Sequence, residues 1–323
     1  MSRSLPILDD AAVLARLVAI DVGRALRDMF AALHAGAAVQ PPQTLTLFPA
    51  EAGDFIVYSG ALAPARAFGV KLSPYIVRNP GPLITAWTLL MSMETGEPLL
   101  LCDAKRLTTE RTAGTAALAV DLLAHADART LAIVGIGDVA EAHLRHVAPL
   151  RDWRTIRIAS RATGDRATVV AARFRAADAR AEIAGSVAEA VRDAEVILLC
   201  TSSGAPVLDP ASLARPALIT SISTNAFRAH EIPPEALASM DVYCDYRPTA
   251  PLSAGEMVIA REAHGWSPAA IVGDLPELVA GVAPRPSGGR HAFFRSIGLG
   301  LEDIAVAAEL HRALRAQAKD ATP

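Results

Sequence analysis

Apolar and polar positions follow strand and helix periods along most of the chain, and the segments fall into two blocks. Residues 9–36 repeat apolar side chains at helical spacing and predict two helices, the second ending at Gly36. Strands are predicted over residues 40–48, 54–60, 68–73, 84–93 and 99–103, the last two as a hairpin. We therefore expect the first block to be α+β, with a mostly antiparallel sheet.

From residue 108 onward, buried strands and amphipathic helices alternate. A helix capped by a threonine is expected over 108–124, and a last helix with a broad apolar face from 298 to about 317. Between them we expect strands at 131–134, 155–159, near 183, 195–200, 217–222 and 240–245, with helices at 138–148, 165–177 and 186–191. This alternation predicts an α/β fold with a Rossmann-type, doubly wound parallel sheet.

The junction after the strand at 131–134 has the residues of a dinucleotide-binding turn. Gly135 permits the tight turn, Gly137 lets the backbone approach a pyrophosphate, and Ala140 lets the helix lie close to the strand. The helix that begins at Asp138 directs free N–H groups toward the phosphates. The spacing alone is weak evidence, but the strand and helix around it favour a nucleotide site.

The residues after the later strands predict where the rest of the cofactor binds. Ser160 and Arg161 follow the second strand, where NAD-selective folds place an acidic residue for the ribose; this pair favours NADP(H) over NAD(H), although Asp165 lies close by. Small polar residues follow a later strand at 201–206. The predicted cofactor contacts are Gly135, Gly137, Asp138, Val139, Ala140, Ser160, Arg161, Thr201, Ser202, Ser223 and Ser296.

Two cations of the first block and its following helix stand at unexpected positions. Lys71 lies in the middle of the apolar strand 68–72, either as an edge lysine facing solvent or as an ammonium in a pocket. Arg111 is placed in the first turn of the predicted helix, where a cation opposes the helix dipole at a cost of up to about 1 kcal/mol. A bound anion shared with the free N–H groups would explain it, as would a surface pair with Glu110 or an acidic residue earlier in the chain.

Composition limits the class of partner. The 323 residues carry a net charge of −3 without a run of Lys or Arg, which argues against a nucleic-acid or anionic-membrane partner. Charges interrupt each apolar run before the roughly 18 residues that a membrane span needs. The N-terminal residues lack the apolar stretch of a signal peptide, and the three cysteines are far apart. We expect a cytoplasmic protein that acts on a small molecule.

The histidines do not show the spacing of metal ligands, so no metal is expected. His143 and His146 are expected on the surface of the helix behind the glycine turn. His230 is a candidate for proton transfer because it lies near Asn225 in the sequence.

Six segments follow one another along the chain: Gly69-Val-Lys-Leu72, Met93-Glu-Thr-Gly-Glu-Pro-Leu99, Leu107-Thr-Thr-Glu-Arg-Thr-Ala113, Val134-Gly-Ile-Gly-Asp-Val-Ala-Glu-Ala-His143, Glu231-Ile232 and Phe294-Arg-Ser-Ile-Gly-Leu-Gly-Leu-Glu-Asp303. Together, and in this order, they resemble the ornithine cyclodeaminase/mu-crystallin family. The resemblance implies a homodimer. It also implies that residues 1–125 with 301–323 form a substrate-binding and dimerisation domain, and that residues 126–300 form an NAD(P)-binding Rossmann domain.

The resemblance also assigns roles to single residues. It implies that Lys71 and Arg111 are the basic pair that binds the substrate carboxylate near the reacting carbon. In two places this chain departs from the cyclodeaminases: Gln43 stands for an arginine on the substrate side, and Asn225 stands for the catalytic aspartate. Because an amide cannot act as a carboxylate base, the second departure argues against ring closure by a free amine.

We therefore expect an NAD(P)H-dependent oxidoreductase that reduces an imine or ketimine of an α-keto acid. The pyrroline-2-carboxylate, piperideine-2-carboxylate, iminosuccinate and alanine dehydrogenase types all fit the sequence. Lys71 and Arg111 would hold the carboxylate, Lys71 would donate the proton, and Asn225 would orient the nitrogen. The alternatives are an ornithine or lysine cyclodeaminase with tightly held NAD, and a non-enzymatic protein that retains NADPH.

Overall fold

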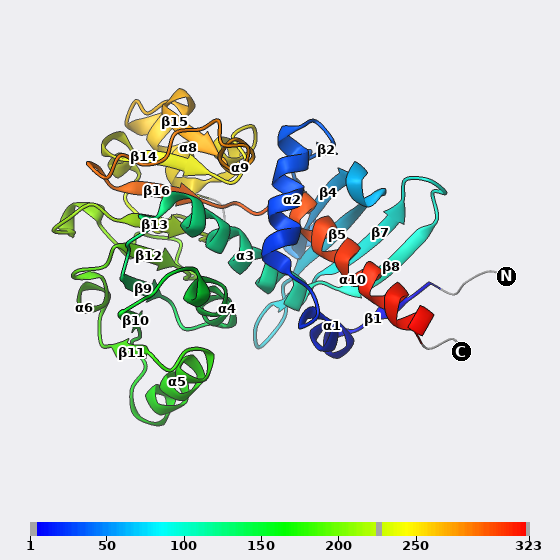
Figure 1. The fold of residues 1–323 in the computed structure, drawn as a ribbon, viewed down its shortest axis with the longest axis horizontal. Helices are drawn as coiled ribbons and strands as arrows, with labels where there is room; N and C mark the ends of the chain where they lie inside the picture. Colours follow the sequence, from blue (N-terminus) through cyan, green and yellow to red (C-terminus); the bar gives the residue numbers. More distant parts are fainter. Residues whose placement is uncertain (1–4, 224–227, 321–323) are drawn as a thin grey trace. The chain divides into compact units, whose positions relative to one another are not determined.

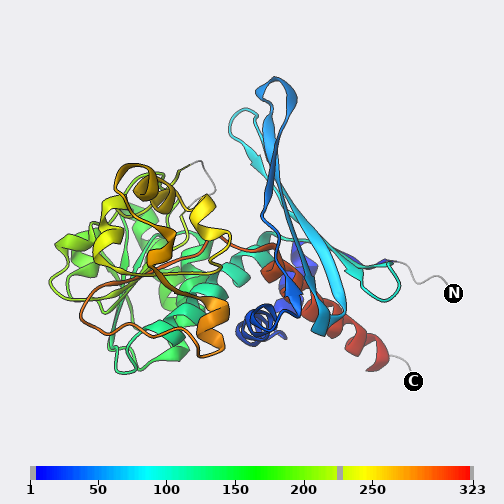
Figure 2. The same cartoon turned by 90° about the horizontal axis from the view of Figure 1, so that it is seen from above.

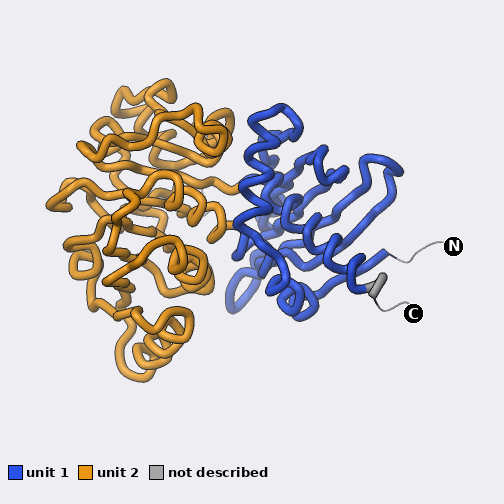
Figure 3. Tube along the Cα trace, viewed as in Figure 1, with its two compact units in different colours: residues 1–111, 299–323 blue, residues 112–298 orange. Residues whose placement is uncertain are grey.

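The computed structural model of the chain describes residues 5–223 and 228–320 and divides into two compact units (Figure 3). Unit 1 comprises Met1–Arg111 and Leu299–Pro323, and unit 2 comprises Thr112–Gly298. The sequence places the first boundary after residue 125, whereas the units divide inside the helix α3 (Lys105–Leu123). The roles assigned to the two domains stay predictions.

Unit 1 is built on an eight-stranded sheet, seen in Figure 1 in blue and cyan. Its strands follow the order β1-β8-β7-β5-β4-β2, with β3 beside β4 and β6 beside β5, and all pairs except β1 with β8 are antiparallel. The strands are β1 (Ile7–Leu8), β2 (Ala38–Val39), β3 (Thr44–Leu47), β4 (Gly53–Leu62), β5 (Ala67–Ile76), β6 (Leu83–Ile84), β7 (Trp87–Ser92) and β8 (Pro98–Asp103). The predicted antiparallel block is confirmed.

Two predicted strands of this block are wrong in part. The segment 84–93 forms two strands, β6 and β7, with a break at 85–86, and the segment 40–48 is also broken. Residues 40–48 were expected to form one strand, but only Thr44–Leu47 does so, and the preceding strand ends at Val39. Pro41 and Pro42 lie between them, and a proline has no N–H to donate to a strand ladder.

The helices α1 (Asp10–Leu17), α2 (Val22–His34) and α10 (Gly300–Asp320) pack on one face of this sheet, as Figure 2 shows. Asp9 and Asp21 cap the first two by accepting from backbone N–H groups three residues ahead. The start of α10 lies against β4 and β5 where glycines leave room: a Cβ on Gly60 would stand 3.0 Å from Leu301 Cα. This close approach brings the first turn of α10 onto the sheet.

Gly69 tests how much this contact depends on glycine. A Cβ at this position would stand 2.2 Å from the backbone oxygen of Leu89 and 2.8 Å from Ile304 Cδ1. We expect Gly69→Ala to lower the free energy of unfolding by about 2–3 kcal/mol, because the backbone of β7 and the side chain of α10 must both move. Urea unfolding measures this, with Gly81→Ala as control because its Cβ would meet nothing within 4 Å. Equal stability of the two variants would contradict this account of the packing.

The helix α3 begins three residues earlier than the sequence predicts, and this changes the position of Arg111. The helix starts at Lys105, whose N–H donates to Asp103 Oδ1 at 2.8 Å, so Asp103 rather than a threonine satisfies the helix start. Arg111 therefore lies in the second turn. The expectation that it stands in the first turn is wrong.

Unit 2 is a parallel sheet of eight strands in the order β11-β10-β9-β12-β13-β16-β14-β15. The strands are β9 (Thr130–Val134), β10 (Thr155–Ala159), β11 (Ala181–Ala184), β12 (Val196–Leu199), β13 (Leu218–Ser221), β14 (Asp241–Cys244), β15 (Ile271–Asp274) and β16 (Ala292–Arg295). The chain starts in the middle, winds outward to β11 and returns to β12 beside β9, which confirms the Rossmann-type class.

α-Helices lie in most of the connections between consecutive strands. α4 and α5 contact each other on one face, and α6 covers the other because the chain reverses direction after β11. The helices are α4 (Asp138–Val147), α5 (Gly164–Ala177), α6 (Val187–Val191), α7 (Ala250–Ser253), α8 (Gly255–Ala263) and α9 (Leu275–Val279). The sequence did not predict the strands β15 and β16 or the helices α7, α8 and α9. No membrane-spanning helix occurs in the described ranges, since both helices of sufficient length, α3 and α10, contain too many charged residues.

Candidate active site

A row of four side chains crosses the inner face of the unit 1 sheet. Lys71 of β5 lies opposite Tyr58 of β4 and Thr88 of β7, and Thr88 lies opposite Cys102 of β8. Lys71 is only 2% exposed, and its Nζ lies 4.2 Å from the centre of the Tyr58 ring. A solvent-facing edge lysine is therefore excluded, because β5 is paired on both sides and this face is covered by α10.

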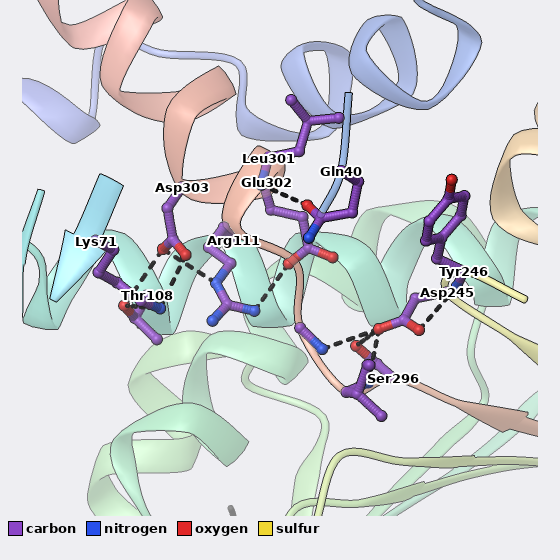
Figure 4. A network of polar contacts seen from close by, with 12 residues as sticks. Gln40, Lys71, Thr108, Arg111, Asp245, Tyr246, Ser296, Leu301, Glu302 and Asp303 are labelled. Atoms are coloured by element: carbon purple, nitrogen blue, oxygen red, sulfur yellow. Dashed lines mark hydrogen bonds and ion pairs between the residues drawn. The ribbon is translucent and has the colours of Figure 1, made fainter. Parts of the chain in front are cut away.

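The first turn of α10 supplies two carboxylates to this row (Figure 4). Asp303 Oδ2 lies 2.8 Å from Lys71 Nζ, and Asp303 Oδ1 accepts from Arg111 Nε at 3.3 Å. Glu302 Oε2 accepts from Arg111 Nη1 at 2.8 Å. All four side chains are buried, and we call them the ion cluster. Thr108 joins it, since its hydroxyl lies 3.4 Å from Lys71 Nζ and 3.5 Å from Asp303 Oδ1.

The ion cluster accounts for both unexpected cations. Arg111 is buried, so a surface pair with Glu110 does not explain it; its guanidinium is held by Glu302 and Asp303 instead. Two cations and two carboxylates balance in charge, which a buried group of this size requires. The structure thus brings Lys71 and Arg111 to the same carboxylate, and their role in binding a substrate stays a prediction.

The environment shifts the protonation equilibrium of these groups. Burial lowers the pKa of Lys71 from its ordinary 10.5 to about 8; the Asp303 carboxylate opposes this and the Arg111 guanidinium adds to it. Burial also acts to lower the pKa of Arg111, but Asp303 and Glu302 outweigh it and raise that pKa. Burial, with Asp303 and Asp103 adding to it, raises the pKa of the Cys102 thiol to about 12. Lys71 therefore changes its charge near pH 8 rather than near pH 10.5.

A pH dependence of activity follows from the lowered pKa of Lys71. Catalysis that requires the Lys71 ammonium, as anion binder or proton donor, is retained below pH 8 and is lost as the pH rises through about 8, because the side chain is then neutral. The basic limb of kcat/KM measures this. In Lys71→Arg, whose guanidinium stays protonated, residual activity should lack that limb. A wild-type profile flat to pH 9.5 would contradict the assignment.

Sequence reasoning did not single out Glu302 and Asp303 as site residues. The available signal is their position: two adjacent acids in the first turn of a helix whose neighbours Leu301 and Ile304 are fully buried. Carboxylates among buried apolar side chains need partners, and the two unexplained cations were the candidates.

Gln43 and Asn225 are the two amides that the sequence predicts near the substrate. Gln43 is half-buried, and its Oε1 has no hydrogen-bond partner among the described residues. Gln40 is the amide that contacts α10, because its Oε1 accepts from Leu301 N at 2.9 Å. Asn225 lies outside the described residues. His230 is described, and its Nδ1 lies 2.7 Å from the Arg228 carbonyl oxygen.

In unit 2, the glycine turn after β9 leaves open backbone at a helix start. Gly135 has φ +133°, and a Cβ there would stand 2.3 Å from the Cys200 carbonyl oxygen, so this position requires glycine. Gly137 precedes α4 without a side-chain cap, and a Cβ on it would meet no protein atom within 4 Å. The uncapped N–H groups and the open space fit a dinucleotide pyrophosphate.

The other predicted contacts near this turn are described individually. Ala140 is fully buried and Val139 is partly buried, while the Asp138 carboxylate lies 3.7 Å from the Arg173 guanidinium of α5. Arg173 also donates to the Ile136 carbonyl oxygen. Ion pairing to Arg173 would reduce the repulsion between Asp138 and a phosphate at this turn.

Both the backbone and the hydroxyl of Ser160, at the end of β10, are hydrogen-bonded within unit 2. Ser160 is buried, and its Oγ accepts from Ala162 N at 3.1 Å. Arg161 is exposed, and so is Asp165 in the first turn of α5. The predicted contact of Ser160 and Arg161 with a 2′-phosphate stays a prediction.

Two of the remaining predicted contacts use their hydroxyl groups within the protein. Thr201 Oγ1 donates to Glu231 Oε1 at 2.7 Å and accepts from Ser203 N. Ser296 is buried and donates to Asp245 Oδ2 at 3.1 Å, as Figure 4 shows. Ser202 is exposed. The hydroxyls of Thr201 and Ser296 therefore position loops, and direct cofactor contact by them stays a prediction.

The prediction that His143 is a surface residue is wrong. His143 is fully buried, and its Nδ1 lies 2.7 Å from the Val139 carbonyl oxygen one helical turn earlier. His146 is partly buried. No group of His, Cys, Asp or Glu within residues 5–223 and 228–320 has the arrangement of a metal site.

Comparison with known proteins decides the family. The model of the ornithine cyclodeaminase/mu-crystallin family matches residues 7–318. The chain belongs to this family. It is 60% identical over 313 residues to the NAD(P)H-dependent anabolic L-arginine dehydrogenase DauB of Pseudomonas aeruginosa. The aligned region covers 97% of this chain and 98% of that protein.

Two more distant proteins are also similar to the chain, one by sequence and one by structure. The mouse ketimine reductase mu-crystallin is 27% identical over 278 residues, or 85% of each chain. The structure of Thermococcus litoralis Δ1-pyrroline-2-carboxylate reductase with NADH and L-proline is 22% identical, with a TM-score of 0.89 over 97% of this chain and 98% of that one. The predictions of an NAD(P)H-dependent oxidoreductase of this family and of a nicotinamide cofactor are confirmed.

Proposed function

We propose that this protein is an arginine dehydrogenase that works in the reductive direction. It would reduce the imine formed from ammonia and the 2-oxo acid of arginine, 5-guanidino-2-oxopentanoate, to L-arginine. The observation that carries the proposal is the 60% identity, over nearly the full length of both chains, with the anabolic L-arginine dehydrogenase. The earlier expectation of an α-keto-acid imine is consistent with this substrate.

The ion cluster supplies the groups that bind the substrate acid. A guanidinium carries five N–H donors, and the bonds to Asp303 and Glu302 use one each from Nε and Nη1, so Arg111 has further donors to offer a carboxylate. Lys71 Nζ carries three donors and is held by Asp303 and Thr108. A planar guanidinium with a neighbouring ammonium is suited to a carboxylate.

The reaction needs one hydride and one proton. The imine forms from the 2-oxo acid and ammonia with loss of water. The backbone N–H groups of the turn after β9 would hold a reduced nicotinamide cofactor, which would supply the hydride. The proton reaches the imine nitrogen, and Lys71 is the donor that this chain offers, since a pKa of about 8 leaves it mostly protonated at neutral pH. Unit 1 supplies the acid-binding groups, and the turn after β9 supplies the phosphate-binding backbone.

A substrate panel tests the proposal directly. NADPH and NADH oxidation is measured with ammonia plus 5-guanidino-2-oxopentanoate, pyruvate or oxaloacetate, and with Δ1-pyrroline-2-carboxylate and Δ1-piperideine-2-carboxylate. We expect the guanidino acid to have the highest kcat/KM. A higher value for a cyclic imine would contradict the proposed substrate. Ammonia release from L-ornithine without net nicotinamide turnover would indicate a cyclodeaminase, and turnover of no compound would indicate a binding protein.

We further propose that Ser160 and Arg161 give a preference for NADPH. Ser160 follows β10 at the ribose position, and no acidic side chain occupies positions 160 and 161. Arg161→Ala should raise KM for NADPH about tenfold and leave KM for NADH within twofold, because only NADPH carries the 2′-phosphate. Steady-state kinetics with both cofactors measure this. An equal change for both cofactors would contradict a role in recognising the 2′-phosphate.

We propose that a second copy of the chain covers the open face of the unit 1 sheet. The face opposite α10 carries no charged side chain on the central strand positions Val57, Ser59, Ala61, Phe68, Val70, Leu72, Trp87, Leu89 and Met91. Phe68, Leu72 and Trp87 are 39%, 43% and 38% exposed, which is unusual for a monomer surface. An uncharged apolar face is self-complementary about a two-fold axis. Sedimentation should show a dimer that Phe68→Arg dissociates; a wild-type monomer would contradict this.

A reducing compartment is also proposed. Cys102, Cys200 and Cys244 are all buried and free, as expected for a cytoplasmic protein.

A further inference from the structure

A buried carboxylate in unit 2 binds the loops that follow two neighbouring strands. Glu231 is fully buried, and its Oε1 accepts from Thr201 N at 2.9 Å and from Thr201 Oγ1 at 2.7 Å, just after β12. Its Oε2 accepts from Ser221 Oγ at 2.7 Å and from Ser223 N at 2.9 Å, at the end of β13. Each oxygen of one carboxylate therefore holds one loop.

Both loops lie at the carboxyl edge of the parallel sheet, where doubly wound folds bind their ligands. Ser223 has φ +49°, a left-handed conformation that residues other than glycine rarely adopt. Such a conformation persists only where its surroundings hold it, and the Ser223 N–H is held by Glu231. Glu231 thus stabilises a strained backbone beside the region expected for the cofactor.

A second buried ion pair supports this carboxylate. Arg295, at the end of β16, donates to Ser221 Oγ at 3.3 Å, and its Nε lies 3.1 Å from Glu256 Oε1 at the start of α8. Both side chains are buried. A contiguous network therefore joins Glu231 to the end of a third strand through Ser221.

We infer that Glu231 is a positioning residue for nicotinamide cofactor binding. It fixes the backbone after β12 and after β13 in the conformation that the cofactor needs, without contacting the cofactor itself. The inference rests on the proposed function, in which unit 2 binds a reduced nicotinamide. It assigns a role to Glu231, which the sequence analysis identified only as part of a segment that resembles the family.

The bonding pattern predicts why an amide cannot replace this carboxylate. Thr201 and Ser223 each direct a backbone N–H at a different oxygen of Glu231, and a backbone N–H cannot reverse its direction. A glutamine has one oxygen and one NH2 group. In either orientation its NH2 group would point at the backbone N–H of Thr201 or of Ser223, so two donors would face each other. The hydroxyl of Ser221, by contrast, can rotate to accept or donate.

The test compares Glu231→Gln with the matched control Ser221→Ala. Ser221→Ala removes one hydroxyl from the network and leaves both backbone donors bonded to Glu231. Fluorescence titration with NADPH and with NADH gives the dissociation constants, and circular dichroism confirms folding. We expect Glu231→Gln to weaken cofactor binding at least tenfold and Ser221→Ala less than threefold. The KM for the cofactor should rise in Glu231→Gln, while the KM for ammonia stays within twofold.

Each outcome bears on the inference. Unchanged cofactor affinity in folded Glu231→Gln overturns the positioning role and leaves the proposed function intact. A wild-type chain that binds neither NADPH nor NADH overturns both. If Glu231→Gln does not fold, amide hydrogen exchange of the cofactor-free wild type decides: slow exchange at Thr201 and Ser223 supports the inference, and fast exchange at either overturns it.

Discussion

Lys71→Ala is expected to lower kcat/KM for the 2-oxo acid by about 10³-fold and to leave the dissociation constant for NADPH within threefold of wild type. The large loss is expected because the substitution removes a carboxylate-binding cation and the proposed proton donor together. Cofactor affinity should persist, because the proposed phosphate-binding turn belongs to unit 2. Initial rates and fluorescence titration measure the two quantities.

A neighbouring lysine provides the control for this substitution. Lys105, at the start of α3, is exposed and outside the ion cluster. Lys105→Ala should keep kcat/KM within twofold. If Lys71→Ala kept more than a tenth of the wild-type kcat/KM, Lys71 would have neither role.

Asp303→Asn is expected to have the largest effect on stability. Asp303 accepts from Arg111 and pairs with Lys71, so the amide leaves two buried cations with one carboxylate. Removing one partner from a buried ion group costs about 3–5 kcal/mol, and Asn should lie at the lower end because it keeps an acceptor oxygen. Since Asp303 also raises the pKa of Lys71, its loss should move the basic limb of kcat/KM from about pH 8 to lower pH.

Glu302→Gln is the matched comparison for Asp303→Asn. Glu302 is equally buried but hydrogen-bonds Arg111 and not Lys71, and it has the smallest of the named effects on the pKa of Lys71. Glu302→Gln should therefore reduce the free energy of unfolding, but shift the basic limb of kcat/KM less than Asp303→Asn does. Urea unfolding and pH profiles of both variants test this. Equal shifts of the basic limb of kcat/KM in the two variants would contradict a larger effect of Asp303 than of Glu302 on the pKa of Lys71.

Much of the fold could be predicted because the chain uses strong local signals. The strand, glycine turn and helix at residues 130–147 are readable from a short apolar run and two glycines, and the structure shows that Gly135 is required by its φ and by the Cys200 carbonyl. The antiparallel block was readable from alternation. Strand β16, by contrast, follows a region rich in Pro and Gly, and its short run Ala292–Arg295 gives little periodicity.

The candidate site was only half predictable, because its partners lie far apart in the sequence. Lys71 and Arg111 were recognisable as anomalies, but their partners Glu302 and Asp303 are 191 and 192 residues from Arg111. Local pattern gives no information about such pairings. The error on the start of α3 has a local cause: Thr108 has the residue type of a cap, but Asp103 occurs earlier and its carboxylate takes that role.

The central claim is that Arg111 and Lys71 bind the carboxylate of the amino acid, and a change on the substrate tests it most directly. In the oxidative direction, kcat/KM is measured for L-arginine and for L-argininamide, which lacks the carboxylate charge, in wild type and in Arg111→Gln paired with Glu302→Gln to keep the charge balance. We predict that wild type prefers L-arginine by about 100-fold and that the preference falls at least tenfold in the double variant. A double variant that keeps the full preference would show that the carboxylate binds elsewhere.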